Sequence, residues 1–215
     1  NNDPTIERSQ IKHYVAKWFV MSTLTSRYIG SPESQMDFDI RRIREKGFMT
    51  FFKEVEEAEL SDTFWNVGLV QNLETHVINS PFFNVFLAAQ IYEGNNALFS
   101  NGTKVGYLIT LMGDVHHIFP KQYLRKNGYD EKRLYNQIAN FTYLDTQVNK
   151  GISDDAPNVY FKNAIEACEN GKTLYGNIAD TPESIVDMDY SNYPDFLASR
   201  RKLMAKKIQN YYKNL

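Results

Sequence analysis

At residues 114–120 the chain reads Asp114-Val115-His116-His117-Ile118-Phe119-Pro120, and this stretch decides which fold we expect. It holds two of the four histidines in the 215-residue chain. A neutral imidazole can act as a base, a proton carrier or a metal ligand near neutral pH. An isolated histidine pair is more often a surface or core feature, so the flanking sequence has to decide between a structural and a chemical role.

The residues on either side of the pair predict a compact arrangement of strands and one helix. Gly106–Met112 is expected to be a strand that leads to the pair, and Phe141–Leu144 a second short strand. Thr146 is suited to cap a following helix, which would place Asn149 in the first turn. The end of one strand and the start of one helix would then face each other across a space that suits a cation.

Two segments of this region resemble a known nuclease motif. They are HHIFPKQYL, from His116, and NQIANFTYLDTQVNKGISDDAP, from Asn136. Together they resemble the HNH motif, also called the ββα-metal or His-Me finger. More narrowly, they resemble the C-terminal half of a bacterial family with a ParB/sulfiredoxin-like N-terminal domain, the broad group that includes GmrSD-type, modification-dependent restriction proteins. Stretches that begin at Trp18, Ser80 and Phe196 resemble the same family, so the likeness covers nearly the whole chain.

The resemblance implies a role for four residues. His117 matches the general base that takes a proton from the attacking water, and Asn140 matches the residue that orients the loop and the base, so both would be catalytic. His116 and Asn149 match the two protein ligands of the metal. Asp114 is a second choice of ligand, because on a strand it would lie about 6–7 Å behind His116.

One divalent cation per site would complete this arrangement. Two protein ligands leave positions for water and a substrate phosphate, which favours Mg²⁺ or Mn²⁺. A mixed histidine and asparagine site could also hold Zn²⁺ or Ni²⁺ without supporting turnover. The family's N-terminal ParB/sulfiredoxin-like domain, which carries its nucleotide-handling motifs, is not among these residues, and we expect it to be a partner within the same polypeptide.

The composition indicates a well-packed globular protein. Apolar residues make up 42% of the chain and aromatic residues 14%, which is too apolar for a disordered segment. No apolar run approaches the roughly 20 residues that span a bilayer, and the polar start does not resemble a signal peptide, so no membrane partner is expected. The single cysteine, Cys168, excludes an internal disulfide and favours a reducing bacterial cytoplasm.

The net charge of −2 does not by itself indicate a nucleic-acid partner, but the basic residues are clustered. Residues 116–150 contain six Lys or Arg against three acidic residues, and residues 200–215 contain six more and no acidic side chain. Such clusters suit contacts with DNA phosphates, although basic residues late in a helix also favour its dipole. The proposed DNA contacts are Lys121, Lys150, Arg200 and Arg201.

Helical patterns dominate the rest of the chain. Ser31-Pro32 predicts the start of one helix and Gly47 its end, while Ser80-Pro81 starts another. The first helix is expected to bury an aromatic face, and a final helix is expected to bury an apolar stripe. The first face consists of Ile11, Tyr14, Val15, Trp18, Phe19 and Ser22; the second helix should turn Met36, Ile40 and Ile43 inward; the final stripe consists of Leu197, Met204, Ile208, Tyr211 and Leu215.

These patterns predict a mainly α fold of the α+β class, a helical scaffold with an embedded ββα-metal (HNH) finger. The scaffold would occupy residues 1–100 and the finger residues 101–165. Residues 166–215 would form an irregular segment and a basic helix that packs on the scaffold. Arg27, Tyr28 and Glu33 would either form an ion pair between helices or face the absent domain.

The function that this sequence suggests is a metal-dependent DNA endonuclease module of a larger restriction or phage-defence protein. Three alternatives stay open at this point. The finger could be degenerate and bind DNA or a partner without cutting. The chain could be a helical interaction module for its own N-terminal domain, or it could hydrolyse a different phosphodiester. No oligomeric state is predicted.

Overall fold

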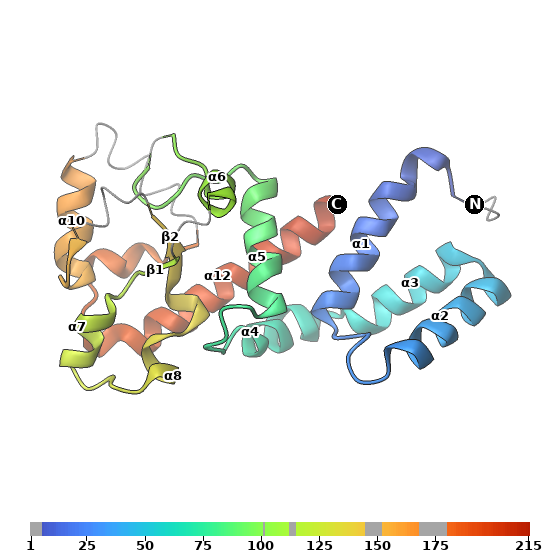
Figure 1. Cartoon of the computed structure of the whole chain (residues 1–215), viewed down its shortest axis with the longest axis horizontal. Helices are drawn as coiled ribbons and strands as arrows, with labels where there is room; N and C mark the ends of the chain where they lie inside the picture. Colours follow the sequence, from blue (N-terminus) through green and yellow to red (C-terminus); the bar gives the residue numbers. More distant parts are fainter. Residues whose placement is uncertain (1–5, 101, 112–114, 145–151, 168–179) are drawn as a thin grey trace.

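The computed structural model describes residues 6–100, 102–111, 115–144, 152–167 and 180–215. It is mainly helical with a small two-stranded sheet, which confirms the expected mainly α class (Figure 1). The long helices are α1 (Ile11–Leu24), α2 (Pro32–Lys46), α3 (Phe48–Glu59), α5 (Pro81–Tyr92), α10 (Pro157–Ala167) and α12 (Tyr193–Asn214). Shorter ones are η1 (Arg8–Gln10), η2 (Phe64–Gly68), α4 (Leu69–Asn72), α6 (Val105–Thr110), α7 (Lys121–Lys126), α8 (Lys132–Tyr135), η3 (Ile138–Asn140), η4 (Glu183–Asp187) and η5 (Tyr190–Asn192).

Helices α1, α2 and α3 form one end of the molecule (Figure 1). The predicted boundaries of α2 are confirmed: Pro32 occupies its first position and Gly47 follows its last residue. Gly47 has a φ of 82°, a conformation that strongly favours glycine, and its N–H donates to Ile43 O over 2.9 Å. The chain therefore turns sharply at Gly47 and α3 begins at the next residue.

A buried ion pair joins these three helices. Arg27, just after α1, donates two hydrogen bonds to the Asp39 carboxylate on α2 over 2.9 and 2.6 Å and contacts Glu59 of α3 at 3.2 Å. Tyr28 Oη donates to the same carboxylate over 2.8 Å. Burial opposes ionisation of Asp39, but these hydrogen bonds outweigh it and lower its pKa. Of the two possible roles for Arg27, the structure shows the ion pair, with Asp39 and Glu59 rather than Glu33 as partners.

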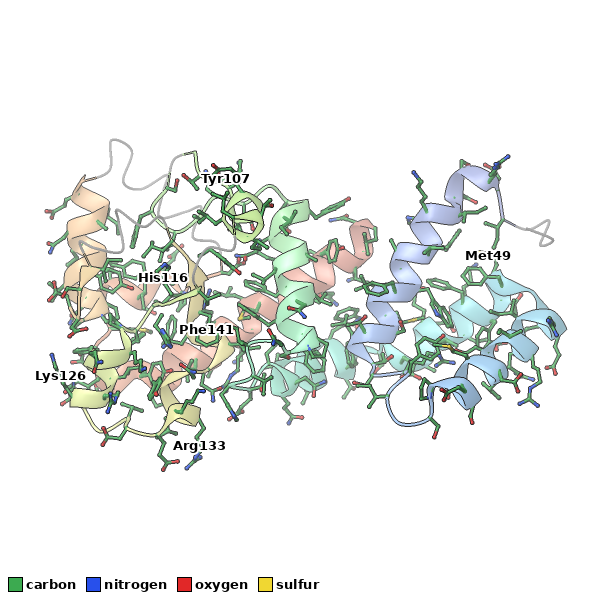
Figure 2. The ribbon with its side chains drawn as sticks, viewed as in Figure 1. Met49, Tyr107, His116, Lys126, Arg133 and Phe141 are labelled. Carbon is green, nitrogen blue, oxygen red and sulfur yellow. The ribbon has the colours of Figure 1, made fainter. Side chains whose placement is uncertain are left out.

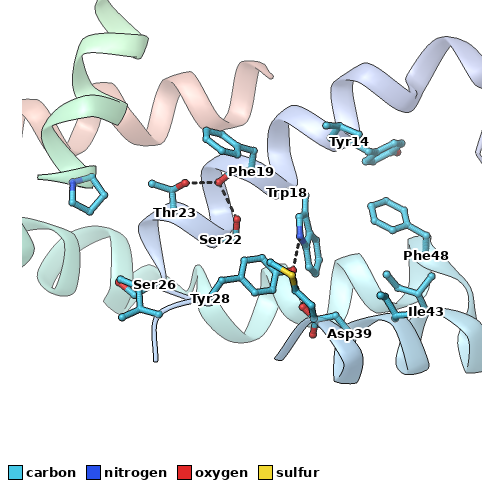
Figure 3. Close-up of a pocket in the computed structure, with 15 residues that line it drawn as sticks. Tyr14, Trp18, Phe19, Ser22, Thr23, Ser26, Tyr28, Asp39, Ile43 and Phe48 are labelled. Carbon is cyan, nitrogen blue, oxygen red and sulfur yellow. Dashed lines mark hydrogen bonds between the residues drawn. The ribbon is translucent and has the colours of Figure 1, made fainter. Parts of the chain in front are cut away.

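The expected burial of the α1 aromatic face is wrong for its outer half, and the expected inward position of Met36 and Ile40 on α2 is wrong as well. Val15 and Phe19 are 63% and 68% exposed, and across from them on α2 Met36 and Ile40 are 47% and 49% exposed. These side chains line an open apolar groove of about 820 Å³ between α1 and α2 (Figure 3). Helical spacing identifies residues that share a face, but it does not show whether another element covers that face.

Helix α12 runs across the remainder of the molecule and contacts α5, α4 and η3 as well as α1 (Figure 1). Most of its predicted apolar stripe is buried, including Leu197, Met204 and Ile208. At the C-terminal end Tyr212 is buried instead of Tyr211. The helix thereby packs both on the 1–100 scaffold and on the segment that contains the histidine pair.

The strand expected at Gly106–Met112 is wrong, because Val105–Thr110 forms helix α6. This helix packs on α5: Val105 is buried, and a Cβ built on Gly106 would lie 3.4 Å from the Ile91 side chain. Short apolar runs cannot be assigned to strand or helix from periodicity alone. Within the described parts of the chain, no helix combines the length and apolar character needed to cross a membrane.

The buried ion pair gives a test of what holds the helical end together. Asp39→Asn should lower the free energy of unfolding by about 3 kcal/mol, because Arg27 keeps a charge that its main buried partner no longer balances. Urea denaturation would measure the loss. Asp37→Asn on the same helix is the matched control, since its pair with Arg41 has side chains 66% and 64% exposed and should cost less than about 0.5 kcal/mol. Equal losses in the two variants would contradict this account.

Candidate functional site

The histidine pair forms one strand of a short antiparallel hairpin. Strand β1 (Val115–His117) pairs with β2 (Phe141–Tyr143), with His116 opposite Thr142 and His117 opposite Phe141. The second strand lies where the sequence predicted it. Because side chains alternate along a strand, the two histidines lie on opposite faces of the hairpin. Figure 2 shows His116 and Phe141 on the two strands.

His117 is half-buried and held on several sides. Its Nε2 lies 2.9 Å from Asn136 Oδ1, and its ring packs edge-on against Phe141 with ring centres 5.1 Å apart. Burial lowers the pKa of His117, and the charges of Lys121 and His116 act in the same direction, while the hydrogen bond to Asn136 opposes them. The imidazole is therefore neutral at neutral pH, which is the state that a general base needs.

Asn140 is fully buried and holds the loop that follows His117. Its Oδ1 accepts from Phe119 N over 2.7 Å, and its Nδ2 donates to the carbonyls of Phe119 and Tyr135, both over 3.1 Å. Its backbone carbonyl accepts from Ile118 N over 2.8 Å. These bonds satisfy the amide almost completely. They fix the backbone of the loop that follows His117.

Two further contacts hold this loop, and no local sequence pattern indicates either of them. Tyr160 of α10 is buried and donates to Ile118 O over 2.5 Å. The ring of Phe119 packs on Tyr193 and Phe196 of α12, with ring centres 5.1 and 4.8 Å apart. The partners lie far along the chain, so no local pattern could have revealed them. The loop that carries the histidines is consequently fixed from two helices.

The proposed metal ligands are described only in part. His116 lies on β1 and is itself half-buried. Asn149, the alternative ligand Asp114 and the basic residue Lys150 lie outside the described residues. In the described ranges, no three His, Cys, Asp or Glu side chains gather as a metal-binding group. Of the predicted site residues that the structure describes, His116 and His117 lie on β1, and Asn140 directly precedes the paired strand β2.

Arg200, one of the proposed DNA contacts, is an interior residue. It is 2% exposed and donates to Ala139 O over 2.7 Å, to Phe141 O over 2.6 Å and to Asp180 O over 3.0 Å. Burial lowers its pKa to about 10, partly offset by the charge of Asp180. Its guanidinium binds the backbone at the start of β2 inside the protein and does not face solvent. We therefore do not include Arg200 in a DNA surface.

The other two described basic candidates differ from each other. Lys121 is exposed at the start of α7, and its Nζ lies 5.3 Å from the centre of the Tyr135 ring, beside His117. Arg201 has a side chain only 12% exposed, with Glu74 at 3.2 Å and Gln137 Oε1 at 3.0 Å. A phosphate contact by Arg201 would have to replace these partners, whereas Lys121 is accessible without rearrangement.

Comparison with known proteins finds a distant relative but assigns no family. The chain is 24% identical over 218 residues to a protein of Methanocaldococcus jannaschii that carries only the name "Uncharacterized protein MJ0686". The alignment covers 90% of this chain and 36% of the relative, so the chain spans about a third of that protein's length. No family model matches the sequence, and no solved structure matches it.

The burial of His117 predicts an acid-shifted titration. In the metal-free protein, the midpoint of His117 should lie below 6.5, because burial penalises the imidazolium and the pH must fall further before the ring takes a proton. NMR titration of the ring protons, assigned with His117→Gln, would measure it in the presence of EDTA. The urea-unfolded chain is the reference. A midpoint at or above 6.5 in the folded protein would overturn this view of the site.

The position of Arg200 predicts a stability defect rather than a simple loss of DNA affinity. Arg200→Met should lower the free energy of unfolding by about 3 kcal/mol, because it leaves buried carbonyls without their donors. Lys202→Met, at an exposed position of the same helix, should change it by less than about 0.5 kcal/mol. Thermal unfolding compares the two. Normal stability with weakened DNA binding in Arg200→Met would contradict this view and indicate that Arg200 contacts DNA.

Proposed function

We propose that this chain is a metal-dependent DNA endonuclease module of the HNH type, part of a larger restriction or phage-defence protein. The observation that supports the proposal most is the setting of His117. It is a half-buried imidazole with a lowered pKa, in a hairpin whose adjoining loop Asn140 holds through both its side chain and its backbone. Order and spacing of the motif residues add to this observation.

In the proposed reaction, His117 accepts a proton from a water molecule that attacks a DNA phosphate. The water would attack in line with the departing 3′ oxygen, which takes a proton from solvent, so that the products are a 5′-phosphate and a 3′-hydroxyl. A neutral imidazole is suited to this transfer near neutral pH. Asn140 contributes by fixing the backbone of Ile118 and Phe119, directly after His117, which limits how far the base can move.

The proposed cofactor is one divalent cation, Mg²⁺ or Mn²⁺, with His116 and Asn149 as its protein ligands. When bound, such a cation offsets the negative charge that develops on the phosphate and the departing oxygen. A donor set of one imidazole and one amide oxygen leaves coordination sites for water and phosphate, which suits these metals. Zn²⁺ bound at the same ligands would be a non-productive occupant.

The proposed substrate is DNA, with Lys121 as its first contact beside the base. Figure 2 shows Lys126 and Arg133 at the outer edge of the same region, and both side chains are exposed. Exposed cations near the site would neutralise phosphates and position the duplex without reading its sequence. The ParB/sulfiredoxin-like domain expected in the same polypeptide would supply target recognition, and we place the activity in the bacterial cytoplasm, where invading DNA is found.

DNA cleavage by this chain and by the full-length protein tests the proposal. Plasmid and phage DNA would be incubated with Mg²⁺, Mn²⁺ or EDTA. We expect metal-dependent nicking that falls at least about a hundredfold in His117→Ala, since a general base commonly contributes that much. His13→Ala, at an exposed position on α1, is the matched control and should cut normally.

Other outcomes would favour the alternatives. Metal and DNA binding by the full-length protein without cleavage of modified or unmodified DNA would identify a degenerate, binding-only finger. Cleavage of RNA or another phosphodiester in place of DNA would identify a different hydrolase. Binding of the N-terminal domain without affinity for either metal or DNA would identify an interaction module.

A further inference from the structure

We infer that Asn136 is a positioning residue that selects the tautomer of His117, keeping the proton on Nε2 and leaving Nδ1 as the basic nitrogen. The role in catalysis rests on the proposed function, whereas the tautomer itself does not. No motif match pointed to Asn136. Its part in the site follows from the 2.9 Å separation between its Oδ1 and the Nε2 atom of His117.

Asn136 is itself held firmly in place. It directly follows helix α8, and its N–H donates to Lys132 O over 3.0 Å. The two preceding residues are also held: Asn140 Nδ2 donates to Tyr135 O over 3.1 Å, and Tyr193 Oη donates to Leu134 O over 3.0 Å. The carboxamide therefore presents its oxygen to His117 from a rigid part of the backbone.

An amide oxygen can only accept a hydrogen bond. A neutral imidazole carries one N–H, and the nitrogen that faces Oδ1 must be the one that carries it. The proton therefore lies on Nε2 and the lone pair on Nδ1. A partner on one ring nitrogen commonly sets the role of the other in this way.

Neighbouring aromatic rings restrict the orientation of the imidazole ring. Phe141 packs against it at an interplanar angle of 85°, and the Tyr135 ring lies on another side with centres 6.3 Å apart. The two aromatic rings fix the plane of the imidazole, and a half-turn within that plane would put Cε1 in place of Nε2 and lose the bond to Asn136. Position, orientation and tautomer of His117 are consequently set together.

This arrangement serves a base throughout its cycle. Nε2–H donates to Asn136 when His117 is neutral, and it still donates after Nδ1 has taken a proton from water. The hydrogen bond strengthens when the ring becomes charged, because a cationic donor binds an amide oxygen more strongly than a neutral one. Asn136 thus stabilises the product of proton transfer without having to move.

Ring-nitrogen NMR of the whole chain tests the tautomer directly. Long-range ¹H–¹⁵N spectra would be recorded with EDTA at a pH where His117 is neutral, with assignment by His117→Gln. Wild type should show the Nε2–H form, at least about tenfold over the other, as expected from one retained hydrogen bond. Asn136→Leu should lower this preference to that of the urea-unfolded chain, and Asn136→Asp should restore it, because a carboxylate also accepts from Nε2–H.

Asn127→Leu is the matched control. Asn127 follows helix α7 as Asn136 follows α8, and its side chain caps that helix through a 2.8 Å bond to Tyr123 O. This variant loses a similar helix-terminal amide and should leave the His117 tautomer unchanged. A protonated Nδ1 in wild type, or an unchanged tautomer in folded Asn136→Leu, would overturn the inference. If Asn136→Leu does not fold, wild type and Asn136→Asp still decide it.

A kinetic readout separates this inference from the proposed function. If the chain cuts DNA, Asn136→Leu should lower kcat by roughly tenfold with KM unchanged, as is usual for a partner that orients a catalytic histidine. Asn136→Asp should recover most of the rate. Absence of cleavage in wild type would contradict the nuclease proposal and leave the NMR result intact. A normal kcat in Asn136→Leu, together with a changed ratio of the two His117 tautomers, would contradict only the catalytic role of Asn136.

Discussion

The buried guanidinium of Arg200 is the interaction on which the candidate site depends. It donates to the carbonyls of Ala139 and Phe141, the residues on either side of Asn140. Asn140 in turn binds the backbone of Phe119 and Tyr135. A charge in the interior is tolerated only when its donors are satisfied, and here those donors fix one short segment of chain. The position of His117 follows from this sequence of contacts, which begins on α12 and ends at the hairpin.

Helices could be predicted where the sequence contains a residue that marks a boundary. Where no such residue is present, the prediction was wrong. Pro32 and Gly47 delimit α2 as expected, since each residue restricts the backbone in a way that a helix end requires. The run from Gly106 lacks such a marker, and its apolar residues suit a strand as well as the helix they form. Arg200 was assigned to the surface by its charge, yet it lies three residues after Leu197 and four before Met204 on the buried stripe. Its helical spacing from these two buried residues indicated its position better than its charge did.

Part of the candidate site could also be predicted, because His116 and His117 lie on β1 and Asn140 directly precedes β2, the strand that pairs with it. The order of His116, His117 and Asn140 in the sequence was enough to anticipate their proximity. Asn136 and Tyr160 could not be anticipated, since each acts through one hydrogen bond to a distant residue and neither interrupts a local pattern. Side-chain partners of this kind are set by tertiary packing, which a single sequence does not display. Asn149 lies outside the described residues and remains a prediction.

During synthesis, the contact between α12 and β2 forms only after both strands have been made. The hairpin is translated before residue 200, but its second strand gains the Arg200 donors only after that residue has left the ribosome. A growing chain therefore exposes the histidine pair before the pair is held in place. If the site is a nuclease, its activity begins only after α12 has been made and has docked. Docking of α12 on β2 then acts as the step that completes the site.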